Sequence, residues 1–429
     1  MNCFQKRREA LASLLSSDDT VFIISAAPYS LRNGDVNYSY RQCSNFYYFT
    51  GFDESNAILL VKKQRRKVYA TIFCQSINPS YDKWHGSVLG PKLAKAKLKI
   101  DKSYSIDDFD KVLPNYLDKN DNIFCVNPGE NNLKERLLKA IHKTNVSDKI
   151  HDATNAINEL RLFKDETEVT MLRNAAKVSC DAHLHAMRHT KPKLRESHVE
   201  GMLISKFMRH GCRQVAYESI VAGGKNACTL HYTKNSNHLV DGELLLVDAG
   251  AEFENYASDI TRTYPINGKF SKEQRAIYEV VLDTQLKLID AAKIGVEWKQ
   301  LQYLSEIEIT KGLVRLGILT GSPKKLVSFG AHKQFYMHGF GHWLGLDVHD
   351  VGSYKNKDGS SRMLEPGMVF TVEPGIYIDA SAKVAAKWKN IGIRIEDDIV
   401  ITNQGTEVLT ESLPKSVLDI ENIVGSAYA

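Results

Sequence analysis

The sequence lacks the features of a disulfide-stabilised or membrane-spanning protein. It has seven cysteines, an odd number, and no two of them form a C-x-x-C pair. We therefore expect neither a disulfide framework nor a cysteine zinc site, and we predict a reduced, cytoplasmic setting. No uninterrupted apolar run approaches the roughly 20 residues of a membrane helix, so no membrane is expected as a partner. The start of the chain has no apolar stretch followed by small residues, which predicts no secretory signal.

A strong excess of charge of one sign is also missing. The net charge of +5 comes from 56 basic and 51 acidic residues. The densest basic run, "KKQRRK" at Lys62–Lys67, lies between the strand-like "AILLV" and "VYATIF". Solvated charges in a hairpin turn explain this run, and we expect no nucleic-acid partner.

The length and composition are those of a globular protein with more than one domain. The chain has 429 residues, of which 43% are hydrophobic, and this length predicts about two or three domains. Residues 1–160 alternate short apolar runs with turns and helical stretches, which predicts an α/β domain. These runs are "TVFIIS", "NFYYFTGF", "NAILLV", "KVYATIF" and "NIFCV". We expect the domain boundary within residues 151–169, where Asp165 and Glu168 have the spacing of a helix capping box.

Residues 161–429 mix long helices with strands. Ser271 and Gln274 are expected to cap a helix that stops at Gly295. The strand candidates are "GELLLVDAG", "DITRTYP", "GMVFTVEPG" and "GIRIEDDIVIT". Helices beside a largely antiparallel sheet predict an α+β domain.

Two aspartates flank a predicted hairpin. Asp248 ends one apolar strand, and Asp259 opens another eleven positions later. An odd separation around a two-residue turn places both side chains on one face, and four residues on each side of the turn would set them opposite each other. Two carboxylates that close need a cation, a shared proton or solvent. Two solvated strand ends remain the alternative.

Three histidines lie close together in "HGFGHWLGLDVHD". His338 and His342 are four positions apart, but Gly339 and Gly341 disfavour a helix, and no glutamate follows His338. This is therefore not the helical H-E-x-x-H zinc motif. The glycines predict a tight loop that brings backbone close to a ligand. His349 follows after the strand-like "WLGLDV", and three histidines in such a loop favour a functional site over a structural one.

The triplet E-P-G occurs twice in "EPGMVFTVEPG". Pro366 and Gly367 fit the central positions of a type II turn, which makes Glu365 a solvated turn residue. Glu373 instead lies at the far end of the strand "MVFTV", where a carboxylate needs a partner. In "GIRIEDDIVI", strand alternation puts Arg394 and Glu396 on one face, although a surface ion pair would explain these two residues alone.

Together these residues make an oxygen-rich set of four carboxylates and one histidine. Such a set suits Mn²⁺, Co²⁺ or Fe²⁺, or a pair of Zn²⁺ ions. Carboxylates that bridge two ions point to two-metal hydrolysis.

At these residues the sequence resembles the metallopeptidases of the pita-bread fold, and among them the Xaa-Pro aminopeptidases (aminopeptidase P). The resemblance covers almost the whole chain. The N-terminal motifs are "YRQCSNFYYFTGFDE" and "WHGSVLG"; the later ones are "LHYTKN", "VDAGAEFENYASDITRTYP", "HGFGHWLGLDVHDVG", "LEPGMVFTVEPGIYI" and "GIRIEDDIVIT". It implies an α/β N-terminal domain over residues 1–160 and an α+β pita-bread catalytic domain over residues 161–429.

The resemblance also implies a role for each site residue. Two divalent ions per subunit, Mn²⁺ first among the candidates, would have five ligands: Asp248, Asp259, His342, Glu373 and Glu396. Asp259 and Glu396 would bridge the ions, and Glu373 would also accept a proton from water. The residues that match catalytic or substrate-binding positions are His231, His338, His349, Arg394, Tyr217 and Tyr377. Trp84 resembles an aromatic residue that, in tetrameric relatives, reaches a neighbouring subunit's active site, so a homo-oligomer, dimer or tetramer, is expected.

The expected substrates are peptides with an Xaa-Pro N-terminus, cleaved before the proline. A prolidase, which has the same fold and metals but cleaves only dipeptides, is the nearest alternative. A methionine aminopeptidase fits less well because it does not need a long N-terminal domain. A pita-bread protein that binds partners without catalysis is disfavoured because the ligand set is complete.

Overall fold

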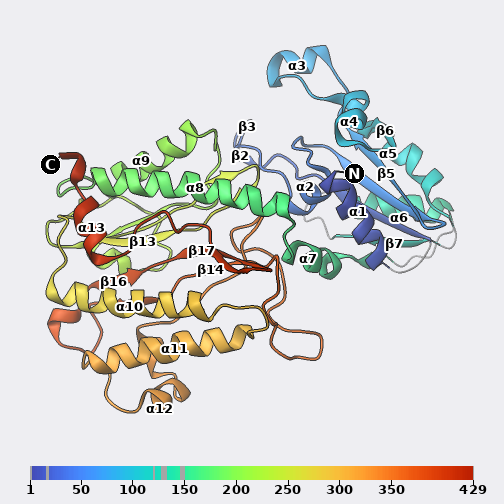
Figure 1. The fold of residues 1–429 in the computed structure, drawn as a ribbon. Helices are drawn as coiled ribbons and strands as arrows, with labels where there is room; N and C mark the ends of the chain where they lie inside the picture. The colour runs from blue at the N-terminus through green and yellow to red at the C-terminus, as the bar shows by residue number, and fades with distance from the viewer. Residues whose placement is uncertain (1, 16–18, 119–120, 127–132, 145–149, 429) are drawn as a thin grey trace. The chain divides into compact units, whose positions relative to one another are not determined.

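The computed structural model describes residues 2–15, 19–118, 121–126, 133–144 and 150–428. The chain divides into two compact units, residues 1–161 and 162–429 (Figure 1). Each unit is described by itself. Among the described residues, no helix combines the length and the apolar character needed to cross a membrane.

The N-terminal unit is built on a mixed six-stranded sheet. Its strand order is β6-β5-β4-β1-β7-β8, in which β1 pairs antiparallel with β4 and parallel with β7. This sheet and its helices confirm the predicted α/β class. The strands are β1 (Thr20–Ser25), β4 (Ile58–Gln64), β5 (Lys67–Cys74), β6 (Lys102–Ser105), β7 (Asn122–Cys125) and β8 (Ile150–Asp152), and a small hairpin is formed by β2 (Leu31–Asn33) and β3 (Val36–Asn37).

Alternation along β1 sends side chains to both faces of this sheet. Val21 and Ile23 join a buried cluster with Leu137 and Ile141 of α6. Phe22 points the other way and makes an edge contact with Phe49 of α2, with ring centroids 5.6 Å apart. The helices are α1 (Cys3–Leu14), α2 (Ser44–Thr50), α3 (Pro79–His85), α4 (Gly90–Leu98), α5 (Phe109–Val112), α6 (Leu133–Thr144) and α7 (Thr154–Leu162).

The basic run is the hairpin turn that its flanks predict. Strands β4 and β5 are joined through Arg65 and Arg66, which have φ values of 49° and 65°. Two consecutive residues with positive φ make a type I′ turn, the form that matches the twist of a two-residue hairpin. The arginines of this turn are exposed to solvent.

One N-terminal apolar run has a different structure from its neighbours. The sequence has one more short apolar run at "NFYYFTGF", but most of this segment forms the helix α2. The helix ends at Gly51, whose φ of 63° is the left-handed conformation of a helix C-terminus. Its aromatic side chains are buried as a group, so packing outweighs their intrinsic preference for strands.

The second unit places helices on both sides of short antiparallel sheets (Figure 1). Helices α8 and α9 lie on one side, and α10 and α11 lie on the other. This arrangement confirms the α+β prediction. The strands are β9 (Ile220–Gly223), β10 (Leu244–Asp248), β11 (Glu252–Phe253), β12 (Tyr256–Ala257), β13 (Thr261–Pro265), β14 (Val369–Val372), β15 (Gly375–Ile378), β16 (Ile391–Arg394), β17 (Asp397–Thr402) and β18 (Gly405–Val408). The helices are α8 (Glu166–His189), α9 (Glu196–Arg209), α10 (Lys272–Ala291), α11 (Trp298–Arg315), α12 (Pro323–Ser328) and α13 (Val417–Ile423).

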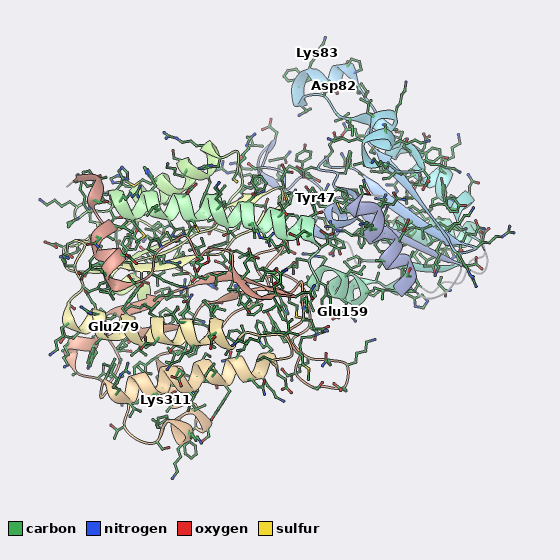
Figure 2. The ribbon with its side chains drawn as sticks, in the orientation of Figure 1. Tyr47, Asp82, Lys83, Glu159, Glu279 and Lys311 are labelled. Carbon is green, nitrogen blue, oxygen red and sulfur yellow. The ribbon has the colours of Figure 1, made fainter. Side chains whose placement is uncertain are left out.

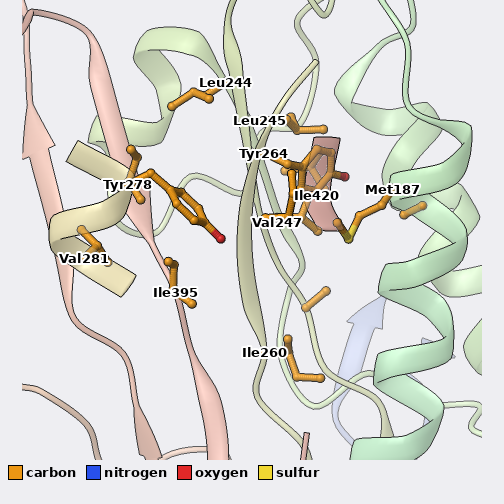
Figure 3. Close-up of a cluster of buried hydrophobic side chains, with 14 of the residues drawn as sticks. Met187, Leu244, Leu245, Val247, Ile260, Tyr264, Tyr278, Val281, Ile395 and Ile420 are labelled. Carbon is orange, nitrogen blue, oxygen red and sulfur yellow. The ribbon is translucent and has the colours of Figure 1, made fainter. Parts of the chain in front are cut away.

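The largest core cluster of this unit lies on both sides of β10 and β13. Figure 3 shows Met187 of α8 near Val247 and Tyr264, whereas Tyr278 and Val281 of α10 lie on the other side of the strands. The buried faces of two long helices thus hold the sheet rigidly between them.

Both predicted capping boxes are present. Asp165 and Glu168 cap α8, and Ser271 and Gln274 cap α10. Helix α10 ends at Ala291, so the predicted stop at Gly295 is four residues too late. Gly295, with a φ of 83°, instead lies in the turn that leads to α11. Charged residues such as Glu279 and Lys311 lie on α10 and α11 (Figure 2), where they pair within their own helices.

Candidate metallopeptidase active site

A cavity of about 220 Å³ in the second unit gathers nine of the predicted site residues. They come from strand ends and loops far apart in the sequence. Rigid strands that end at a common point place polar groups more firmly than loops alone. The cavity is lined by Leu230, His231, Asp248, Asp259, His338, His342, His349, Glu373, Arg394 and Glu396.

The two aspartates lie on one face of the β10–β13 pair, as the odd spacing predicts. Asp248 pairs directly with Thr261, so Asp259 is two residues away from the expected opposite position. The turn between the strands lies at Glu254 and Asn255, both with positive φ, one residue later than expected. The Tyr217 hydroxyl lies 2.5 Å from one oxygen of each aspartate and donates into the pair.

The two glutamates of the repeated triplet have different surroundings, as predicted. Gly367 has a φ of 89°, which fits the type II turn, and Glu365 is exposed. Glu373 follows the end of β14 and lines the cavity. Its Oε1 lies 3.6 Å from Nε2 of His342, and its Oε2 lies 3.6 Å from Nδ1 of His338.

The segment "GIRIEDDIVIT" is two strands instead of one. Strand β16 ends at Arg394, and β17 begins at Asp397 in a different sheet. Glu396 lies in this break, held by a hydrogen bond from its backbone N–H to Thr261 O. Arg394 is buried and donates to Asp248 and to the Tyr377 hydroxyl, so the surface-pair interpretation is wrong.

The histidine segment is a loop, as its glycines predict, but "WLGLDV" is not a strand. It is irregular apart from a single bridge between Trp343 and Phe370, because its backbone bonds back on itself from Asp350 N to Trp343 O. Gly341 brings the backbone close to β14 and not to a ligand. A Cβ at Gly341 would lie 1.8 Å from Thr371 O, so the loop reaches this position only with glycine.

His342 is oriented by its backbone. Its Nδ1 lies 3.0 Å from Trp343 O, which fixes the N–H on Nδ1 and leaves Nε2 to face the cavity. Nε2 lies 3.3 Å from Oδ2 of Asp259. Burial disfavours the charged ring, but Asp259 and Glu373 outweigh burial and raise the pKa of His342 to about 9.

The carboxylates of the cavity repel each other in a buried space. Burial raises the pKa of Glu373 to about 7, against the lowering effect of His342 and Arg394. Burial and the charge of Asp259 raise the pKa of Glu396 well above its ordinary value. One ligand atom from each of Asp259, His342 and Glu396 lies within 4.8 Å of the others, so these three groups can hold a metal ion.

Of the other predicted residues, three histidines line the cavity and Trp84 lies in the N-terminal unit. His338 Nε2 lies 2.8 Å from the Tyr377 hydroxyl, and the rings of His349 and His342 are 4.4 Å apart at their centroids. His231 lines the cavity from an exposed loop position. Trp84 is on α3 in the N-terminal unit, with 85% of its surface exposed.

Sequence reasoning missed three polar residues beside the ligands. Thr261 donates to Glu396 at 2.6 Å and accepts from Arg394, and Thr371 accepts from the His342 N–H. Asp398 accepts hydrogen bonds from Ser258 and from the backbone of Asp259. Each lies two positions from a predicted ligand, so period-two alternation along the strands was the available signal.

Comparisons with known families agree with this geometry. Residues 170–403 match metallopeptidase family M24, and residues 4–124 match the aminopeptidase P N-terminal domain. The chain belongs to metallopeptidase family M24. It is 42% identical to an Xaa-Pro aminopeptidase of Haemophilus influenzae over 98% of this chain and 96% of that protein. It is 40% identical to an Xaa-Pro aminopeptidase of Escherichia coli over 99% and 98%.

Solved structures similar to this M24 chain extend the match to the whole fold. The Pseudomonas aeruginosa aminopeptidase PepP has a TM-score of 0.96 and 41% identity, covering 99% of this chain and 98% of that one. A zinc-substituted E. coli aminopeptidase P in complex with product has a TM-score of 0.94 and 39% identity, covering 100% and 98%. The pita-bread fold of the second unit is therefore confirmed, and the M24 chain is a metallopeptidase.

Proposed function

We propose that this M24 enzyme is an Xaa-Pro aminopeptidase, which releases the first residue of peptides that have proline in the second position. The observation that carries the proposal is the single cavity in which four carboxylates, four histidines and one arginine converge. The full-length likeness to Xaa-Pro aminopeptidases supports this substrate class. We assign residues 1–160 to the N-terminal domain and residues 161–429 to the catalytic domain.

The donor set fits divalent metal ions. Four buried carboxylates close together need positive charge nearby. A protonated His342 offsets only part of their negative charge. We propose that the oxygen and imidazole donors of the cavity would hold two divalent ions, Mn²⁺ first among the candidates. Their Lewis acidity supplies water that is acidic enough to react at neutral pH. The ligands are Asp248, Asp259, His342, Glu373 and Glu396.

The chain's own residues then bind the peptide and move the proton. Glu373 accepts the proton of the attacking water, since its carboxylate lines the cavity beside the other proposed ligands and a carboxylate in reach of the water can act as a general base. The peptide's free amine lies near Asp248, whose two oxygens are held by Tyr217 and Arg394. His349 stabilises the oxyanion, and His231 and His338 hold the peptide.

Selection for proline follows from what proline lacks. An imide nitrogen carries no hydrogen, so the site selects the ring by shape instead of by accepting a hydrogen bond. Tyr377 and Tyr217 keep the cavity walls in place through their bonds to Arg394 and the aspartates. We further propose a cytoplasmic homo-oligomer, dimer or tetramer, in which the exposed Trp84 lies against a neighbouring subunit.

The repeated triplet gives the test of this proposal. Glu373→Gln removes the proton acceptor and is expected to lower kcat for an Xaa-Pro-Xaa peptide by about 10² to 10⁴-fold. Glu365→Gln is the matched control, since the same change at an exposed turn is expected to leave kcat within about twofold. Release of the first residue is measured by chromatography. Equal losses in the two variants would contradict the role of Glu373.

Substrate length separates the proposal from a prolidase. Wild-type enzyme is expected to cleave Xaa-Pro-Xaa and longer peptides, and cleavage of an Xaa-Pro dipeptide alone would assign it as a prolidase. Chelation is expected to stop the reaction and added Mn²⁺ to restore it. Full activity in metal-free protein would overturn the two-metal site.

A further inference from the structure

A fully buried glutamate holds the loop that carries His231. Glu196 is the first residue of α9 and has no exposed surface. Its Oε1 accepts hydrogen bonds from the Gly223 N–H and the Asn226 side chain, both at 2.8 Å. Its Oε2 accepts from the Tyr232 hydroxyl at 2.9 Å and the Asn237 N–H at 2.8 Å. One carboxylate thus holds the loop at four points, two on each oxygen.

These four hydrogen bonds are spread along the loop that follows β9, from the end of that strand to the point where the loop lies against the start of α9. Gly223 is the last residue of β9, and Asn237 O accepts a hydrogen bond from the backbone N–H of Glu196. Asn235 adds a second clamp, because its side chain bonds the backbone of Val221 and Ser219. The loop has little regular structure beyond one short 3₁₀ turn at its start. Its conformation therefore depends on these side-chain bonds.

The same loop leaves His231 exposed between two neighbours that are partly buried. Leu230 and Tyr232 pack against an apolar cluster that contains Tyr377. His231 between them is exposed and lines the active-site cavity. Tyr232 is thus both packed against the wall of the site and bonded to Glu196, one residue from the histidine.

We infer that Glu196 is a positioning residue, whose carboxylate fixes the loop of residues 223–237 so that His231 meets the bound peptide. The inference rests on the peptide-binding role of His231 in the proposed function. All four donors are neutral groups on an ionised acceptor, which makes these hydrogen bonds stronger than neutral ones. Loss of the carboxylate leaves donors without acceptors and lets His231 move, and a shift of about 1 Å in a substrate-positioning group costs up to about 10²-fold in rate.

A double-mutant cycle tests this coupling. Glu196→Gln keeps the shape of the side chain. Each oxygen of Glu196 accepts two hydrogen bonds, so in either orientation the glutamine amide nitrogen, itself a donor, faces two donors. Alone it is expected to lower kcat/KM for an Xaa-Pro-Xaa peptide by about tenfold or more. In the His231→Ala background it is expected to add less than about twofold, because the positioned group is already absent. An equal loss in both backgrounds, or wild-type activity of Glu196→Gln, would overturn the inference.

A matched control separates positioning from general damage. Glu168 is also buried and accepts a tyrosine hydroxyl, from Tyr256 at 3.0 Å. Glu168→Gln is expected to lower the melting temperature while kcat/KM stays within about twofold. If Glu196→Gln does not fold, Tyr232→Phe removes one of the four bonds: it supports the inference if its smaller loss disappears with His231→Ala, and overturns it if the loss persists.

A readout without catalysis distinguishes this inference from the proposed function. In spectra of protein with ¹³C-labelled histidine, the His231 signal is identified by its absence in His231→Ala. Glu196→Gln is expected to shift or broaden that signal and to leave the His189 signal in place. An unchanged His231 signal would overturn the inference, even if the wild-type enzyme cleaves Xaa-Pro peptides. Failure of the wild type to cleave them would reject the proposed function alone.

Discussion

Chemically identical side chains of this protein behave differently because solvent or neighbouring charges surround their polar groups to different degrees. Glu365 and Glu373 each begin a copy of the E-P-G triplet. Glu365 is exposed to solvent, whereas histidines and an arginine surround Glu373. His183 is an opposite case: burial and the charge of Arg262 disfavour a charged ring there, and Asp259 opposes them only in part. Its Nε2 lies 2.8 Å from Ala249 O, and its Nδ1 has no hydrogen-bond partner among the described residues. The fold therefore requires the neutral ring.

His183 predicts a loss of stability in acid. Burial lowers the pKa of His183 to about 4, below its ordinary value near 6.5. Above pH 6.5 the ring is neutral in both folded and unfolded chains, and no stability is lost. As the pH falls from about 6.5 towards 4, only the unfolded chain takes up the proton, so the free energy of unfolding drops, by about 2 kcal/mol at pH 5.

The variant His183→Gln isolates this effect, because its amide nitrogen can still donate to Ala249 O and does not titrate. Urea unfolding at pH 7.5 and pH 5 is the measurement. The wild type should lose about 2 kcal/mol more than the variant between the two values. The same pH dependence in both proteins would show that the ring is not held neutral.

At the scale of elements, local patterns predicted the strands and caps, and tertiary contacts decided the rest. Alternation predicted that Asp248 and Asp259 share a face, because that depends only on the parity of their separation. It did not predict their register, since Glu254 and Asn255 form the turn one residue later than expected. The split between β16 and β17 was equally invisible, because two different sheets take up the two halves of one apolar run.

A buried ion pair joins two further elements of the catalytic unit. Lys164 precedes α8, and its Nζ lies 2.9 Å from Oδ2 of Asp350 in the histidine loop. Both side chains are 1% exposed. Lys164 also bonds through its backbone N–H to Gly367 O, in the first E-P-G turn. The segment before α8 thus holds both the histidine loop and the turn that leads into β14.

Removal of one partner of this ion pair should lower the stability of the protein. Lys164→Met removes one charge of this buried pair, which is expected to lower the free energy of unfolding by about 3–5 kcal/mol. The double variant with Asp350→Asn should recover much of this loss. Denaturant midpoints give the values. Lys293→Met, in an exposed pair with Asp290 of the same unit, is the control and should not change the midpoint measurably. A Lys164→Met protein as stable as this control would contradict the argument.

At the scale of the whole molecule, each unit has its own core and only one has the metal ligands. One buried cluster draws on described residues between Val21 and Ile141, and the clusters of the second unit draw on residues from Leu162 onward. All five proposed ligands belong to the second unit. Ligand binding stabilises only the structure that holds the ligand.

Metal removal should therefore affect one unfolding transition out of two. At a free metal concentration about a thousandfold above Kd, binding adds about 4 kcal/mol to the stability of the catalytic unit. Calorimetry before and after chelation is expected to lower the melting temperature of one transition and to leave the other in place. Asp259→Asn should lose this response to the chelator. A single transition that moves as a whole would mean that the two units unfold together.

The long-range bonds of α8 have a consequence for how the chain is made. Arg173 of this helix pairs with Glu407, 234 positions later. At a synthesis rate of about 5–20 residues per second, Arg173 leaves the ribosome on the order of ten to fifty seconds before its partner. During that interval the N-terminal unit can already fold, while the apolar face of α8 waits without the strands that cover it. The nascent catalytic unit therefore keeps apolar surface exposed until nearly its last strand has been translated.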